Sequence, residues 1–222
     1  MDQYVNRALQ ACLQAYGQLS SLSDTDLVPQ LVEVFDQDHP FLEKVVRLDA
    51  VFDDFHGFEE MREVAFDLLL INFFAADAEK LEDDYLESDE WEAIEDQTID
   101  RGTELLNVLL YLRECADESI EPQLSDYLKE FLLVDEDEFQ DEHRIYEPVI
   151  ANQLLVESAY SEIGKVASNI PENQEIAELF YPVMGFFYEQ KPTEADMAEF
   201  TRSSPNPAFD TAVYSLLVAY NH

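Results

Sequence analysis

The residues with the clearest potential for chemistry are two Asp-x-x-His pairs, Asp36 with His39 and Asp53 with His56. Residues three apart on a helix project from one face, and dimetal bundles place Glu-x-x-His pairs on two of their helices. Here aspartate replaces the longer glutamate, and His39 directly precedes Pro40, at a helix boundary. A metal-binding protein or helix-bundle enzyme that uses these four residues is therefore an alternative interpretation of the sequence.

No other pattern in the sequence points to catalysis. The five glycines are Gly17, Gly57, Gly102, Gly164 and Gly185, which are too far apart to form a phosphate-binding loop. No G-x-S-x-G, H-E-x-x-H, Walker-type or kinase-type string occurs. We therefore expect a protein without a cofactor, and a binding protein rather than an enzyme.

The strongest property of the chain is its charge. Fifty Asp and Glu residues stand against twelve Lys and Arg residues among 222, a formal net charge of −38, yet 47% of the residues are hydrophobic. Because disordered acidic chains are poor in hydrophobic residues, this composition indicates a folded body that carries its carboxylates outside. Such a surface repels phosphates, so we expect no direct binding to nucleic acid or to an anionic membrane.

The acidic residues concentrate in one segment, residues 77–100, which contains twelve Asp and Glu residues and one base, Lys80. As one continuous helix, this segment would place a carboxylate about every 3 Å along its axis, close to the ~3.4 Å between phosphates of one strand. The candidate partner-binding residues are Glu79, Glu82, Asp83, Asp84, Glu87, Asp89, Glu90, Trp91, Glu92, Glu95 and Asp96, with Asp135, Glu136, Asp137 and Glu138 from a second acidic run.

Three functions fit such a surface. One is an acidic interaction module that binds a basic protein surface, as a nucleic-acid mimic that inhibits or regulates a nucleic-acid-binding protein. Another is a soluble protein adapted to high salt, whose acids serve only solvation. The third is the metal-binding alternative above. The helical, acidic composition, rich in Tyr and Phe, is similar to that of phage antirestriction DNA mimics, a resemblance of composition without a shared motif.

Apolar residues recur at helical spacing along nearly the whole chain, which predicts an all-α protein, an irregular bundle of eight to ten amphipathic helices. Ser88 and Thr193 have the types and positions of helix N-caps. The pattern predicts long helices from Phe58 to Tyr85 and from Trp91 to Cys115. Trp91 is then either a hydrophobic anchor of its helix or an exposed aromatic contact in the acidic surface.

We expect one domain over residues 1–222, with 118–122 and 135–147 as the places where two units would divide. Leu69-Leu70 and Leu109-Leu110 are forty residues apart, and helix pairs of the HEAT type are the repeat alternative to an irregular bundle. We expect the two isolated cysteines, Cys12 and Cys115, to be buried thiols. Since no signal peptide or membrane-spanning run is visible, we expect a cytoplasmic protein.

Overall fold

The computed structural model describes residues 1–77, 80, 82–132 and 136–222, and the side chains of these residues except 83, 130–132 and 136–142. The described residues form helices and no strand, which confirms the all-α prediction. They contain thirteen α-helices and two 3₁₀ helices, more than the eight to ten helices predicted, because several expected helices are divided.

The helices of the first half are α1 (Gln3–Ser20), α2 (Leu27–Asp36), α3 (Phe41–Asp54), the 3₁₀ helix η1 (His56–Met61), α4 (Arg62–Ala76), α5 (Asp83–Leu86), α6 (Asp89–Thr98) and α7 (Leu105–Glu118). Those of the second half are α8 (Leu124–Leu132), α9 (Glu136–Ala151), the 3₁₀ helix η3 (Gln153–Glu157), α10 (Tyr160–Ala167), α11 (Ala177–Tyr188), α12 (Glu194–Ser203) and α13 (Pro207–Tyr220).

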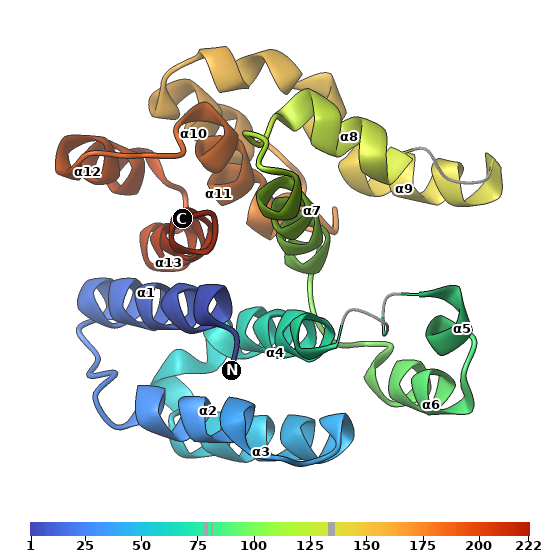
Figure 1. Ribbon diagram of the computed structural model, residues 1–222. Coiled ribbons are helices and arrows are strands. Elements are labelled where there is room, and N and C mark those ends of the chain that lie inside the picture. Colours follow the sequence, from blue (N-terminus) through green and yellow to red (C-terminus); the bar gives the residue numbers. More distant parts are fainter. Residues whose placement is uncertain (78–79, 81, 133–135) are drawn as a thin grey trace.

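The helix α4 lies in the middle of the molecule, against α1, α3 and α7 (Figure 1). Its sequence is apolar around most of its circumference, and such a helix is stable only where neighbours cover every side. Ten of its residues are accordingly buried, including the polar side chains of Asp67 and Asn72. Asn72 accepts a hydrogen bond from the backbone N–H of Asp2 at 2.8 Å, so the centre of the bundle also fixes the start of α1.

The helices α1 and α13 lie side by side, and this is the most extensive helix contact in the described part of the chain (Figure 1). The rings of Tyr4 and Tyr220 approach to 6.2 Å between centroids at one end of the pair. On the opposite side of α1, α2 and α3 form a hairpin, and α10 to α12 pack around α13. The buried hydrophobic side chains form one contiguous cluster that draws on helices from α1 to α13.

The prediction of two long continuous helices is wrong. The Phe58–Tyr85 helix is in fact η1 followed by α4, which ends at Ala76, and α5 is separate. The Trp91–Cys115 helix is divided into α6 and α7 at Gly102, whose φ of +81° lies in the left-handed region and interrupts an α-helix. The HEAT alternative and the one-domain organisation stay predictions.

The predicted helix caps are confirmed. The Ser88 hydroxyl accepts a hydrogen bond from the Trp91 N–H, and Thr193 and Asp196 form a capping box at the start of α12. Cys12 and Cys115 are both free and buried, as expected, and burial raises the pKa of the Cys12 thiol to about 12. Among the described residues, no helix combines the length and apolarity that crossing a bilayer requires.

Candidate functional site

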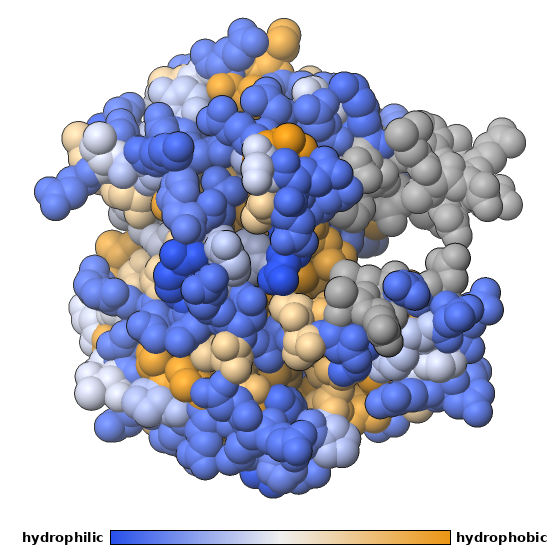
Figure 2. All heavy atoms as spheres, viewed as in Figure 1, coloured by the Kyte–Doolittle hydropathy of each residue, from blue (hydrophilic) through white to orange (hydrophobic). Residues whose placement is uncertain are grey.

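The helices α5 and α6 stand apart from the bundle, at the right of Figure 1. We call residues 82–100 the acidic arm. This segment has ten Asp and Glu residues and neither Lys nor Arg. Eight of its candidate site residues are exposed: Glu82, Asp84, Glu87, Asp89, Glu90, Glu92, Glu95 and Asp96. Figure 2 shows hydrophilic side chains over the outward side of this part of the molecule.

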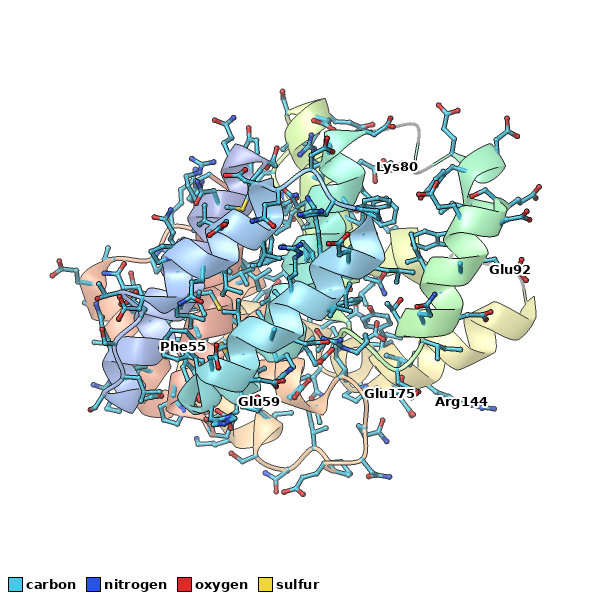
Figure 3. The ribbon with its side chains drawn as sticks, turned by 90° about the horizontal axis from the view of Figure 1, so that it is seen from below. Phe55, Glu59, Lys80, Glu92, Arg144 and Glu175 are labelled. Carbon is cyan, nitrogen blue, oxygen red and sulfur yellow. The ribbon has the colours of Figure 1, made fainter. Side chains whose placement is uncertain are left out.

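One face of α6 packs against the bundle and a neighbouring face carries the acids. Successive residues turn by about 100° around a helix, so Trp91 and Ile94 share one side, and Ile94 is buried. Asp89, Glu92, Glu95 and Asp96 fall within an arc of about 120° on the next side, which we call the acidic face. Glu92 points away from the bundle in Figure 3.

Aromatic contacts attach the arm to α4. The Trp91 ring lies 5.4 Å from Phe74 and 6.2 Å from Tyr85, and Tyr85 lies 6.3 Å from Phe73, all between centroids. Trp91 is half-buried in this cluster. Of its two predicted roles, these contacts match the hydrophobic anchor, because the ring joins the helix that carries the acidic face to the centre of the bundle.

No ion pair among the described side chains reaches the carboxylates of the arm. Elsewhere six cationic side chains are paired with acids: Arg47 with Glu43, Arg62 with Asp49, Asp53 and Glu59, Arg101 with Asp49 and Glu63, Arg113 with Asp2 and Asp117, Lys129 with Asp126, and Lys165 with Glu162. These six cations therefore pair with acids of the bundle, and none of them pairs with a described carboxylate of the arm.

The loop that follows the arm is clamped to α3 and α4. Arg101 pairs with Glu63 and Asp49, each at 3.0 Å. The Gly102 N–H donates to Glu63 at 2.7 Å, and Thr103 donates to Asp67 from its N–H at 3.1 Å and from its hydroxyl at 2.6 Å. These carboxylates take up backbone N–H groups that the break between α6 and α7 would otherwise leave without partners.

Burial makes Asp67 an unusual acid. The side chain is 1% exposed, and its burial raises the pKa well above 3.8, against the hydrogen bonds from Thr103, which lower it. The carboxylates of Glu63 and Glu104 raise the pKa further. Holding this group inside the bundle costs free energy, and the bonds to Thr103 offset part of that cost.

A cavity of about 420 Å³ separates the inner side of the arm from the start of α3. Lys44, Lys80 and His39 line it together with Asp38 and Glu90. Lys44 donates to the Phe35 carbonyl at 2.8 Å, and the Lys80 ammonium lies 3.7 Å from the centre of the Phe73 ring. Because both acids and bases line this cavity, it offers no surface of a single charge.

Part of the predicted partner surface lies outside the described residues. Glu79 and Asp135 belong to this part, as do the side chains of Asp83, Glu136, Asp137 and Glu138. The backbone of the last three residues forms the first turn of α9. Whether the second acidic run joins the arm stays a prediction.

The two Asp-x-x-His pairs do not come together. Asp36 and His39 lie near the start of α3, whereas Asp53 and His56 lie at its other end, about 18 Å away along the helix. Asp36 pairs with the N-terminal ammonium group and Asp53 with Arg62 at 2.7 Å. Within the described residues, no group of three or more His, Cys, Asp and Glu side chains is placed to hold a metal ion.

Sequence reasoning missed the clamp of Asp49, Glu63 and Asp67 on residues 101–103. The available signals were an acid inside the apolar run of α4, at Asp67, and an Arg-Gly pair directly after the acidic segment, at residues 101 and 102. Neither signal identifies the other, because the two lie more than thirty residues apart.

Comparison of the chain with protein-family models, with curated proteins and with solved structures found no match.

Proposed function

We propose that this protein is an acidic binding protein whose arm docks onto the basic surface of another protein, at a place where that protein otherwise holds nucleic acid. The observation that carries the proposal is the acidic face of α6, which is exposed and has no cationic partner among the described side chains. A basic partner would meet carboxylates that need not first be released from internal ion pairs.

The charge density of α6 supports the mimicry of nucleic acid. Its ten residues extend about 15 Å and include five acids, or about one charge every 3 Å. One strand of nucleic acid carries a phosphate every ~3.4 Å. A groove that accommodates a phosphate backbone would therefore meet a similar linear charge density on α6.

The attachment of the arm also suits binding. The anchor at Trp91 and the clamp at residues 101–103 hold α6 at both ends of its sequence. A surface that is held before binding loses less conformational entropy when the partner arrives. The mutual repulsion of neighbouring acids, such as Glu92 and Asp96 one helical turn apart, would be relieved by the partner's cations.

The test is a competition for basic proteins that are bound to nucleic acid. Proteins retained from a cell lysate on DNA-cellulose and RNA-cellulose at low salt are washed with this protein instead of with salt. We expect a small set of them to be released, and a released protein to bind the purified chain with an affinity that falls as salt rises.

Two variants of equal charge make this test specific. One neutralises the acidic face as Glu92→Gln, Glu95→Gln and Asp96→Asn, which spares the acids at the first two positions of α6. The other neutralises three exposed acids elsewhere, as Asp54→Asn, Glu118→Gln and Glu172→Gln. The slope of the logarithm of the binding constant against the logarithm of salt concentration should become about 2 to 3 less steep in the first variant. It should stay unchanged in the second. Equal losses in both variants, or no release by the wild type, would contradict the proposal.

A further inference from the structure

A second recessed surface is formed by segments that follow the arm in the sequence. Its walls come from residues 121–125 at the start of α8, from η3, and from residues 187–191 at the end of α11. These segments enclose a cavity of about 480 Å³. We call it the η3 cavity.

Hydrophobic side chains are exposed around this cavity. Leu154 and Tyr188 line it and are 78% and 38% exposed, and Ile120, beside the lining residue Glu121, is 50% exposed. Single exposed hydrophobic residues are ordinary on protein surfaces. Here, however, two of the eight most exposed large hydrophobic residues of the described surface line one cavity, and a third, Ile120, is the chain neighbour of a lining residue. Such a concentration beside a cavity indicates an interaction site.

The charge of the η3 cavity has one dominant sign. Glu121, Glu157 and Glu189 line it, and Lys191 is the one base among its described lining residues. None of the three glutamates forms an ion pair with a described side chain. The helix α11 also ends here, at Tyr188, without a basic residue in its last turn, so its carbonyl end adds negative potential. A cation is the charge that fits this rim.

The backbone around the cavity is held in place. Gln190 donates to the Pro122 carbonyl at 2.8 Å, which joins the end of α11 to the loop before α8. Tyr111 both donates to the Gln123 carbonyl at 3.1 Å and accepts from the Gln123 N–H at 2.9 Å. The cavity therefore exists before any ligand binds, and a ligand would not have to order it.

We propose that the η3 cavity binds a short basic segment of another protein, in which one large apolar side chain stands between arginines or lysines. The apolar side chain enters the cavity beside Leu154 and Tyr188, and the flanking cations meet the three glutamates. The complementary charge of the rim selects this occupant over an acidic or purely apolar segment. This site does not depend on the proposed function of the arm, which shares no residue with it.

Three tripeptides with blocked ends serve as probes: Arg-Trp-Arg, Arg-Gly-Arg and Glu-Trp-Glu. Each is titrated into the ¹⁵N-labelled full chain, and amide shifts are followed by NMR. We expect Arg-Trp-Arg to shift the amides of Leu154, Tyr188 and Gln190. Arg-Gly-Arg lacks the anchor and should shift acidic surfaces generally, and Glu-Trp-Glu should leave the cavity unchanged.

Leu154→Ser tests the apolar part, and its matched control is Val46→Ser on α3, where the side chain is 68% exposed and distant from the cavity. Neither change removes a buried side chain, so both variants should fold. Leu154→Ser should weaken Arg-Trp-Arg binding about fivefold, the equivalent of roughly 1 kcal/mol, and Val46→Ser should not. Equal shifts from Arg-Gly-Arg, equal shifts from Glu-Trp-Glu, or unchanged affinity in Leu154→Ser would overturn the proposal.

Discussion

The indole ring of Trp91 lies 5.4 Å from the phenyl ring of Phe74, centroid to centroid. This contact joins the helix that carries the acidic face to α4, ten of whose residues are buried. Trp91 is the only tryptophan in the chain, and Ile94 is the one fully buried residue of α6. The position of the acidic face thus depends on few hydrophobic contacts, and these can be removed one at a time.

Replacing Trp91 with alanine should release the arm while the bundle stays folded. The change removes the contacts with Phe74 and Tyr85, so we expect hydrogen exchange at the α6 amides to become at least tenfold faster, with the α1 and α13 amides unchanged. Trp91→Phe keeps an aromatic ring and should show a smaller increase. Mass spectrometry of exchanged peptides measures both, and uniform acceleration over the whole chain would show that the arm has no independent stability.

Replacing Gly102 with alanine should weaken the clamp. Its φ is +81°, and an added Cβ would lie 2.6 Å from a carboxylate oxygen of Asp67. We expect a loss of about 2 kcal/mol of unfolding free energy, measured by urea denaturation. At Gly57 an added Cβ would meet the flexible end of Leu22, so Gly57→Ala is the matched control and should cost less than half as much.

Asp210 should make the stability depend on pH in the opposite direction to an ordinary salt-bridged carboxylate. The side chain is buried, and burial raises its pKa from 3.8 to about 6, against hydrogen bonds from Ser204 at 2.5 Å and from the Asn206 N–H at 3.1 Å. Because the folded pKa exceeds the unfolded one, ionisation of this group destabilises the fold above pH 6, and the penalty disappears as pH falls from about 6 to about 4.

Asp210→Asn tests this sign. Both hydrogen bonds end on one oxygen, Oδ2, which an asparagine carbonyl can replace while the buried charge is removed. The variant should gain about 2 kcal/mol of unfolding free energy at pH 7.5 and little at pH 4.5. The exposed Asp26→Asn should show no such difference. A variant less stable than the wild type at pH 7.5 would mean that the charge itself stabilises the start of α13.

The fold should persist at ordinary salt. Among the described side chains, six Lys and Arg residues form ion pairs, and the described acids of the arm are exposed to water and to counterions. We expect a cooperative thermal transition in 0.15 M NaCl, with a midpoint that rises by several degrees as the salt screens repulsion. Loss of the transition at 0.15 M would favour adaptation to high salt over partner binding.

The sequence predicts the helices well because their signals are local. The Ser88 cap and the Thr193 capping box depend on residues within one turn, and both form as expected. The division at Gly102 depends on Glu63 and Asp67, which approach only when α4 is in place. The apolar residues of α6 and α7 continue nearly the same helical spacing on both sides of this glycine. Periodicity alone therefore predicts one uninterrupted helix here.

The same distinction applies to the candidate site. Exposure of Glu92, Glu95 and Asp96 follows from their charge, since unpaired carboxylates are rarely buried. That no described ion pair reaches the arm could not be predicted, because it depends on which acids Arg62 and Arg101 contact in three dimensions. The η3 cavity draws on three segments spread over seventy residues, and no local pattern marks it.

The packing of α1 against α13 has a consequence for biosynthesis. A ribosome adds roughly 5 to 20 residues per second, so α1 waits on the order of 10 to 40 s before α13 has been made. During that time the side of α1 that packs against α13 in the finished protein has no α13 to cover it. Nascent chains of this protein are therefore expected to be clients of ribosome-associated chaperones, and α1 is the segment that such a chaperone would hold.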